Sequence, residues 1–217
     1  MTTYGTMQTR IADELVRDDL ASQIRNAIQD AIKQWEGRRF SFNEKRYKIN
    51  TVAAQEYYDL IPSTLLLYDG TALSTGEMLL EIDDVLCTVN SQPYKLTPRT
   101  DLWIEENQSG TYQGQPDSWS VYGNQLRIYP IPRDVYALYP RGLGRLATLS
   151  ADADTNNWMT EGEPLVRNQA KVIIYRDIVR DADGKGLAEQ ALAEAEWTLS
   201  RKAAAKNMTG VQAAWSL

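Results

Sequence analysis

The stretch QIRNAIQDAIKQWEGRRFSFNE, residues 23–44, joins a regular helical pattern to a run of arginine and aromatic side chains. Its apolar residues recur at intervals of three or four, which places them on one face of a helix. They are Ile24, Ala27, Ile28, Ala31, Ile32 and Trp35. We predict a helix over residues 20–36, with an N-cap in residues 17–19 and Gly37 in the left-handed conformation at its end. Beyond Gly37 the helical period is lost, so the chain enters a different kind of structure.

The composition indicates a folded chain with a substantial core. It has 217 residues, of which 43% are hydrophobic, so a core can be buried. The sequence has no internal repeat and no low-complexity linker, which favours one cooperative unit with two lobes. The formal net charge of -6 argues against binding to nucleic acid through overall charge, although a local basic patch stays open. Tyr 12 and Trp 6 against Phe 2 are typical of a tyrosine-rich sheet and suit surfaces that contact other proteins.

Several classes of site are excluded by the residues that are missing. With His 0, neither a Ser-His-Asp nor a Cys-His site can be built, and zinc sites that need histidine fail too. The single cysteine, Cys87, excludes an intramolecular disulfide and lies in an apolar run, so we expect it in the core. No apolar stretch approaches the ~20 residues that span a bilayer, and the N-terminus lacks a secretory pattern. Chemistry with paired carboxylates, a lysine or a carboxylate-bound magnesium ion stays open, but the sequence selects no such site. We expect no catalytic residue, cofactor, metal or membrane contact, and synthesis in the cytoplasm.

The middle of the chain, residues 40–149, has the pattern of short strands separated by Gly, Pro and Asn. Residues 118–130 predict a hairpin, and residues 134–149 predict a strand that Pro140 interrupts. A short helix is expected over residues 98–108. Thr100 or Asp101 would cap it, and its inward-facing residues would be Leu102, Trp103 and Ile104. Strands this short predict an antiparallel sandwich or barrel.

Helical patterns return after residue 157. Thr160 and Glu163 have the spacing of a capping box, and Pro164 suits the first turn. The first apolar stripe consists of Val166, Ala170, Ile173, Ile174 and Ile178. Beyond Gly184 and Gly186 a second helix would carry a face of small residues, which lets two helices approach closely. That face consists of Ala188, Ala191, Leu192, Ala195 and Leu199.

The fold class is therefore predicted to be α+β, with a helical bundle made by the N- and C-terminal helices and an inserted antiparallel β-rich lobe. The terminal helices must pair in space because neither pair alone can bury its apolar stripe. We expect the bundle in residues 1–37 and 157–206, the lobe in 38–156 and a docking tail in 207–217. The predicted bundle core is Ile24, Ile28, Ile32, Trp35, Ile173, Ile174, Leu192 and Leu199.

Three motifs with possible chemistry are weak. RGLGRL, residues 141–146, lacks the Lys-Ser/Thr of a phosphate loop, so Gly142 and Gly144 favour a turn or a β-bulge. The sequence DADTNN at 152–157 lacks the glycine and glutamate of a calcium loop. A carboxylate pair could lie at glycosidase distance, but nothing selects one pair. The acids in question are Glu81, Asp83, Asp84, Glu105, Glu106, Asp152 and Asp154.

Two segments are candidates for contact with other molecules. Residues 36–48 carry five basic and two acidic side chains, a local charge of +3. Contact with DNA phosphate, contact with an acidic partner and a solvated corner between two lobes all stay open. The proposed subunit or partner contacts are Arg38, Arg39, Phe40, Phe42, Lys45 and Arg46. The apolar C-terminal tail, with Val211, Trp215 and Leu217, either packs on its own bundle or docks in a partner's groove.

The order of several phrases resembles the head-to-tail adaptors of tailed bacteriophages, also called connector or neck proteins of short-tailed phages. The resemblance covers nearly the whole chain and depends on a succession of segments. They are residues 4–44, 51–60, 98–108, 125–132 and 149–175.

This resemblance implies a structural virion protein that carries out no catalysis. It implies a homo-oligomeric ring, usually of twelve copies, below the portal protein, which extends the DNA channel and offers a platform for tail or nozzle proteins. Val211, Trp215 and Leu217 would then be the portal-docking residues, and DNA would pass an acidic channel without specific binding. The alternatives are a carboxylate-based cell-wall glycan hydrolase of a phage tail and a nucleic-acid-binding module at residues 38–48.

Overall fold

The computed structural model describes residues 2–108 and 110–214, with side chains through residue 205. The fold is α+β, with helices at both ends of the chain and a strand-rich region between them, which confirms the predicted class. Of the described residues, 2–43 and 149–214 form one compact unit, called here the helical unit. Residues 44–148 form the second, called here the β-rich unit.

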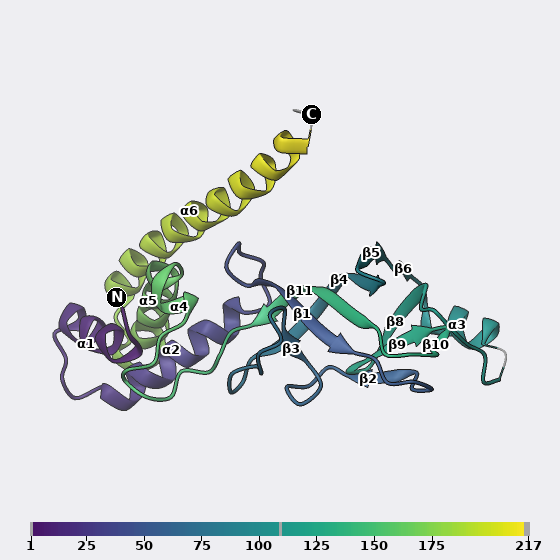
Figure 1. Cartoon of the computed structure of the whole chain (residues 1–217). Coiled ribbons are helices and arrows are strands. Elements are labelled where there is room, and N and C mark those ends of the chain that lie inside the picture. The colour runs from purple at the N-terminus through teal and green to yellow at the C-terminus, as the bar shows by residue number, and fades with distance from the viewer. Residues whose placement is uncertain (1, 109, 215–217) are drawn as a thin grey trace. The chain divides into compact units, whose positions relative to one another are not determined.

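The helical unit contains two helices from the N-terminal segment and the rest from the C-terminal segment (Figure 1). These elements are α1 (Tyr4–Leu15), α2 (Ala21–Trp35), α4 (Asn157–Thr160), α5 (Glu163–Ile174), the π-helical turn η1 (Tyr175–Val179) and α6 (Ala182–Ala214). Helix α2 packs on α5, α1 packs on both, and α5 packs on α6. The N- and C-terminal segments therefore share one apolar core.

The ends of α2 differ from the prediction. Its N-cap is Leu20, whose side chain has no atom that can accept a hydrogen bond. Asp19, within the expected N-cap segment, instead accepts two 2.7 Å hydrogen bonds from Arg17. At the other end the cap is Glu36 in the right-handed helical region, and Gly37 is not left-handed. The helix itself, with its apolar stripe, lies where the period predicts it.

The C-terminal helices also start at other residues than predicted. Glu163 and Thr160 do not form a capping box, because α5 begins after Gly162, whereas Pro164 does lie in its first turn. Helix α6 begins at Ala182, so Gly184 and Gly186 lie inside it, and its backbone continues through most of the expected docking tail. Ile178, expected in the apolar stripe, is 38% exposed because the π-helical turn shifts its direction.

The core of the helical unit contains most of the residues expected there. Ile24, Ile28 and Ile174 are at most 1% exposed, and Ile173 and Leu199 are buried. Ile32, Trp35 and Leu192 are half-buried. Each fully buried aliphatic side chain contributes about 1.5–3 kcal/mol relative to the exposed state, so this stripe supplies much of the stability of the unit.

The β-rich unit contains an antiparallel sheet with the strand order β3-β1-β11-β4-β5. Its strands are β1 (Glu44–Asn50), β3 (Leu66–Leu67), β4 (Met78–Val89), β5 (Gln92–Lys95) and β11 (Ala137–Arg145). A second sheet has the order β2-β9-β8-β6, in which the β6–β8 pair is parallel. Its strands are β2 (Tyr57–Asp59), β6 (Thr97–Pro98), β8 (Ser118–Tyr122) and β9 (Gln125–Tyr129).

One apolar cluster draws residues from both sheets, as in a sandwich. Ile49 and Leu138 of the first sheet and Leu126 and Ile128 of the second are 0% exposed within it. Cys87 also lies there, as expected, and burial raises the pKa of its thiol. A parallel pair, β7 (Gln113–Gly114) with β10 (Ile131–Pro132), and the helix α3 (Asp101–Asn107) complete the unit.

The predicted hairpin, helix cap and bulge of this unit are confirmed, with corrections in detail. Strands β8 and β9 pair from Ser118 to Tyr129, and Thr100 caps α3 by accepting a 3.2 Å hydrogen bond from the backbone N–H of Trp103. Ile104 faces inward, but Leu102 is 66% exposed because it lies on the opposite side of the helix.

Strand β11 explains the glycine-rich motif. Its register with β4 shifts at Arg141/Gly142 and at Leu143/Gly144. A Cβ atom on Gly142 would lie 1.9 Å from the carbonyl oxygen of Glu81, so only glycine allows this approach. Pro140 does not end the strand, but the pairing with β1 skips from Arg141 to Leu138, since proline has no N–H to donate.

Candidate assembly surface

The two phenylalanines of the expected contact set are buried in the helical unit. Phe40 is 2% and Phe42 6% exposed, and their rings stack with centroids 5.3 Å apart. Both rings meet the edge of Trp158, at 5.8 and 5.0 Å. The structure corrects their assignment as contact side chains, because this aromatic cluster closes the core where the chain leaves α2.

The basic side chains of the same set are divided between the two units. In the helical unit, Arg38 pairs with Glu196, while Arg39 is exposed. In the β-rich unit, Lys45 pairs with the buried Glu77, and the guanidinium of Arg46 lies 4.3 Å from the ring centroid of Tyr68. Most of the expected local charge is therefore already engaged inside each unit, which weakens the interpretation as a DNA phosphate site.

The side chains of the expected portal-docking residues lie outside the described part of the chain. Val211 lies in the last turns of α6, where the backbone alone is described. Trp215 and Leu217 lie outside the described residues. Their docking role stays a prediction.

Helix α6 has one side in the core of the helical unit and one side in solvent. Ala188 and Leu199 are 4% and 7% exposed, whereas Trp197 is 61% exposed. Residues two positions apart on a helix point in nearly opposite directions, so Trp197 faces away from Leu199 and from α5. With 33 residues α6 is about 50 Å long, against about 18 Å for the 12 residues of α5. Much of α6 therefore extends beyond α5 (Figure 1).

An arginine accompanies this exposed tryptophan. The guanidinium carbon of Arg201, one turn further along α6, lies 4.7 Å from the centroid of the Trp197 ring. This is a cation–π geometry, which holds both side chains in one direction. Tryptophan and arginine are the residues that most often dominate the binding energy of protein interfaces. The periodicity of the core face does not predict this pair, but its i, i+4 spacing on the face opposite Leu192 and Leu199 is a detectable signal in the sequence.

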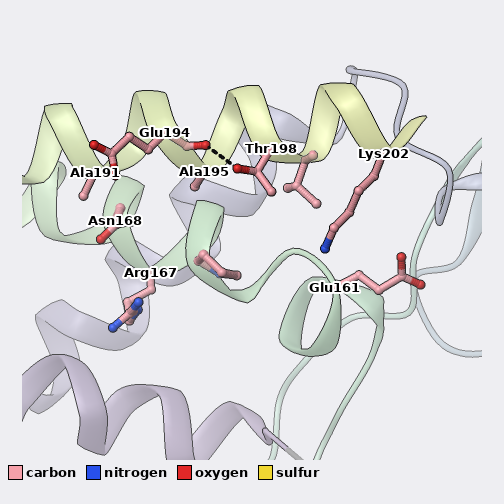
Figure 2. Close-up of a pocket in the computed structure, with 10 residues that line it drawn as sticks. Glu161, Arg167, Asn168, Ala191, Glu194, Ala195, Thr198 and Lys202 are labelled. Carbon is pink, nitrogen blue, oxygen red and sulfur yellow. Dashed lines mark hydrogen bonds between the residues drawn. The ribbon is translucent and has the colours of Figure 1, made fainter. Parts of the chain in front are cut away.

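A groove of about 360 Å³ lies between α5 and α6 (Figure 2). Its lining residues are Glu161, Pro164, Arg167, Asn168, Ala191, Glu194, Ala195, Thr198, Leu199 and Lys202. The hydroxyl of Thr198 donates a 2.9 Å hydrogen bond to the backbone carbonyl of Glu194. In Figure 2, Lys202 extends from α6 toward the segment that carries Glu161. The walls combine small apolar side chains with charged groups at the rim.

An ion-pair cluster joins α1 to α5. Glu14 accepts from Lys171 at 2.8 Å and pairs with Arg167, while Arg10 reaches both Glu14 at 3.3 Å and Glu163 at 3.1 Å. Burial alone would raise the pKa of Glu14, but Lys171 and Arg167 outweigh it and the pKa is lowered. The cluster is a clasp between two helices and offers no free group to a ligand.

A second ion-pair cluster, in the β-rich unit, is centred on one buried arginine that pairs with several carboxylates. Arg127 is 3% exposed and pairs with Glu56, with Asp101 at 3.1 Å and with Glu105 at 2.7 Å. Burial would lower its pKa, but the hydrogen bonds to these carboxylates raise it. This arrangement attaches α3 to β9, and no sequence pattern predicts it because its partners come from separate segments.

Three of the other acidic residues considered for catalysis are also engaged. Asp84 makes two bonds, of 2.6 and 2.7 Å, with Arg141, and Asp152 pairs with Arg25 at 3.2 Å. Asp154 accepts two backbone N–H bonds, from Ala151 and Ser150, which lower its pKa. A general acid of a glycosidase needs a raised pKa, so the lowered pKa of Asp154 does not favour this role.

Neither a metal-binding cluster nor a membrane-spanning helix occurs in the described part of the chain. Within residues 2–108 and 110–214 there is no group of three or more Asp, Glu or Cys side chains placed to hold a metal ion. The helices of these residues include none that is both long and apolar enough to cross a membrane.

The surface features thus point to contacts between proteins, and the comparison with known families agrees. The family model of the SU10 adaptor protein matches residues 2–216. The chain belongs to the SU10 adaptor protein family. The resemblance of this adaptor to phage head-to-tail adaptors, inferred from its sequence, is confirmed at the level of the family. No curated protein matched the adaptor in the search.

Proposed function

We propose that this adaptor forms a homo-oligomeric ring, of twelve copies, below the portal protein of a bacteriophage head. The ring extends the DNA channel and provides the platform to which tail or nozzle proteins attach. The observation that carries the proposal is the family match, which runs over residues 2–216.

The helical unit is the part that we assign to ring formation and portal contact. It carries the exposed Trp197 and the long helix α6, whose backbone continues beyond residue 205 toward the apolar tail. We assign residues 207–217, with Val211, Trp215 and Leu217, to docking on the portal. The β-rich unit, residues 44–148, would serve as the platform.

The acidic balance of the chain fits a conduit for DNA. Its net charge of -6 repels phosphate, so DNA can slide past without sticking. The basic side chains Arg38 and Lys45, which could have opposed this, are paired with Glu196 and Glu77. We therefore expect no specific DNA binding.

Sedimentation with the portal protein of the same phage tests this function. The adaptor should move with the portal in a density gradient, and removal of residues 207–217 should abolish this while leaving the thermal unfolding of the chain unchanged. The matched control is Arg133→Ala, an exposed change in the β-rich unit, which should still bind. If the full chain stays at the top of the gradient, the proposal is wrong. Release of soluble sugar from peptidoglycan would instead support the hydrolase.

A further inference from the structure

Helix α6 presents a protruding side chain on one side and a groove on the other. Trp197 is 61% exposed and is held by Arg201, whereas Ala191, Ala195 and Thr198 line the groove next to α5. Ala195 and Trp197 are two residues apart, so their side chains leave the helix in nearly opposite directions. A single copy cannot place its own Trp197 in its own groove.

The size and chemistry of the groove suit a tryptophan side chain. Its volume of about 360 Å³ can take one large side chain. Pro164, Ala191, Ala195 and Leu199 supply apolar walls, against which an aromatic ring can bury ~150–250 Å². Exposed tryptophan is uncommon on protein surfaces that have no partner, and it is enriched in interfaces.

The charges of the two surfaces are complementary. The carboxylates of Glu161 and Glu194, at the groove, make no ion pair with any residue that the structure describes. Arg167 is already held by Glu14 and Glu163. Among the groove's charges that have no ion-pair partner in the described residues, two are therefore negative and one, on Lys202, is positive. Arg201 stacks on Trp197, and its guanidinium has no carboxylate partner in the described part of the chain.

We propose that adjacent copies of the adaptor are joined by Trp197 and Arg201 of one copy, seated in the α5/α6 groove of the next. Indole fills the apolar part of the groove, and the guanidinium pairs with Glu161 and Glu194. A contact between two different surfaces of the same chain is heterologous, and such contacts close into a ring when the rotation allows it. The inference rests on the proposed ring, and it names the residues that hold the ring together.

Mixed single-cysteine cross-linking on the assembled portal complex tests the contact directly. One copy carries Ala193→Cys, one turn before Trp197 on the same side, and the other carries Ala191→Cys in the groove wall. Oxidation of the mixture should give disulfide-linked dimers. Pairing Ala193→Cys with Ser22→Cys, an exposed position on α2, should give none. The native Cys87 is buried and does not interfere.

The outcomes separate this inference from the proposed function. A ring without the expected cross-link, or with equal cross-linking in the control pair, overturns the contact and leaves the function standing. A portal mixture without any ring overturns the function and this interface together. If Trp197→Ala copies lose portal binding and the cross-link is absent, Trp197 contacts the portal and not the next copy, and the inference is wrong.

A charge exchange gives a second test that does not depend on cysteine placement. Arg201→Glu should raise the adaptor concentration needed for half-maximal ring formation at least ~10-fold, as the loss of a central interface residue does. The double variant Glu161→Arg with Arg201→Glu restores the pair between copies and should return to within ~3-fold of the original chain. Arg201 is exposed, so thermal unfolding should not change. An unaltered ring in Arg201→Glu, or no recovery in the double variant, contradicts the inference.

Discussion

The helical unit and the β-rich unit use charged side chains in different ways. In the helical unit, Glu14 and its partners lie at the surface between α1 and α5, and water shares their charge. In the β-rich unit, Arg127 is 3% exposed and holds three carboxylates together. A buried cation that loses its carboxylates strongly destabilises the fold, because no water replaces them. At the surface, water solvates each charge when an ion pair is broken, so little stability is lost. The β-rich unit should therefore be stiff, and the helical unit should tolerate rearrangement of its surface.

Removal of the buried arginine should give the largest effect. Arg127→Ala leaves Glu56 and Asp101 without their cation and should lower the free energy of unfolding by about 3–5 kcal/mol. Urea unfolding followed by tryptophan fluorescence measures it. The exposed pair Arg133–Asp134 provides the control, and Arg133→Ala should change the same quantity by less than ~0.5 kcal/mol. Equal effects of the two variants would remove the contrast between the units.

A change at the bulge of β11 should have the next largest effect. Gly142→Ala places a methyl group 1.9 Å from the carbonyl oxygen of Glu81, so strand β11 must move, at a cost of about 1–3 kcal/mol. Gly186→Ala in α6 has open space and a helical backbone, so it should stabilise the chain by ~0.5–1 kcal/mol. Thermal unfolding of both variants should shift in opposite directions. A neutral Gly142→Ala would show that the bulge is not needed.

The ion pairs of Glu14 should make the stability of the helical unit depend on pH. The pKa of Glu14 is lowered in the folded chain, so its stabilisation is complete above the unfolded-state value, ~4.3. It is lost as the pH falls below that value through the folded-state pKa. Glu14→Gln should remove about 1 kcal/mol of stability at pH 7 and flatten the acid side of the stability profile. The exposed Glu106→Gln serves as the control, and an unchanged acid limb in Glu14→Gln would contradict the assignment.

The exposed ion pair between Arg38 and Glu196 should make the smallest contribution to stability. Arg38 and Glu196 have side chains 45% and 35% exposed, so Arg38→Ala should cost less than ~1 kcal/mol. The difference in the free energy of unfolding between the original chain and Arg38→Ala, measured by denaturation, should be smaller at high salt than at low salt. A loss that is larger and insensitive to salt would indicate that the packing of Arg38 on Trp35, with 5.5 Å between the guanidinium and the ring centroid, carries the stability instead.

The sequence predicts those parts of the fold that depend on local period or local turn chemistry. The stripe of α2, the hairpin of β8 and β9 and the bulge at Gly142 are of this kind. The burial of Phe40 depends on Trp158, 118 residues away, and the site of Arg127 depends on three separate segments. Periodicity within one segment cannot contain such information. Gly184 and Gly186 predict a later start for α6 than Ala182, but packing on α5 outweighs their low helix propensity.

The most direct measurement is imaging by electron microscopy of the portal protein mixed with the purified adaptor. The account predicts a symmetric ring of adaptor copies added to one face of the portal, with Trp197→Ala giving incomplete rings or none. Portal particles without added density, beside an adaptor that remains free at saturating concentration, would contradict the central claim that this chain is a ring-forming head-to-tail adaptor.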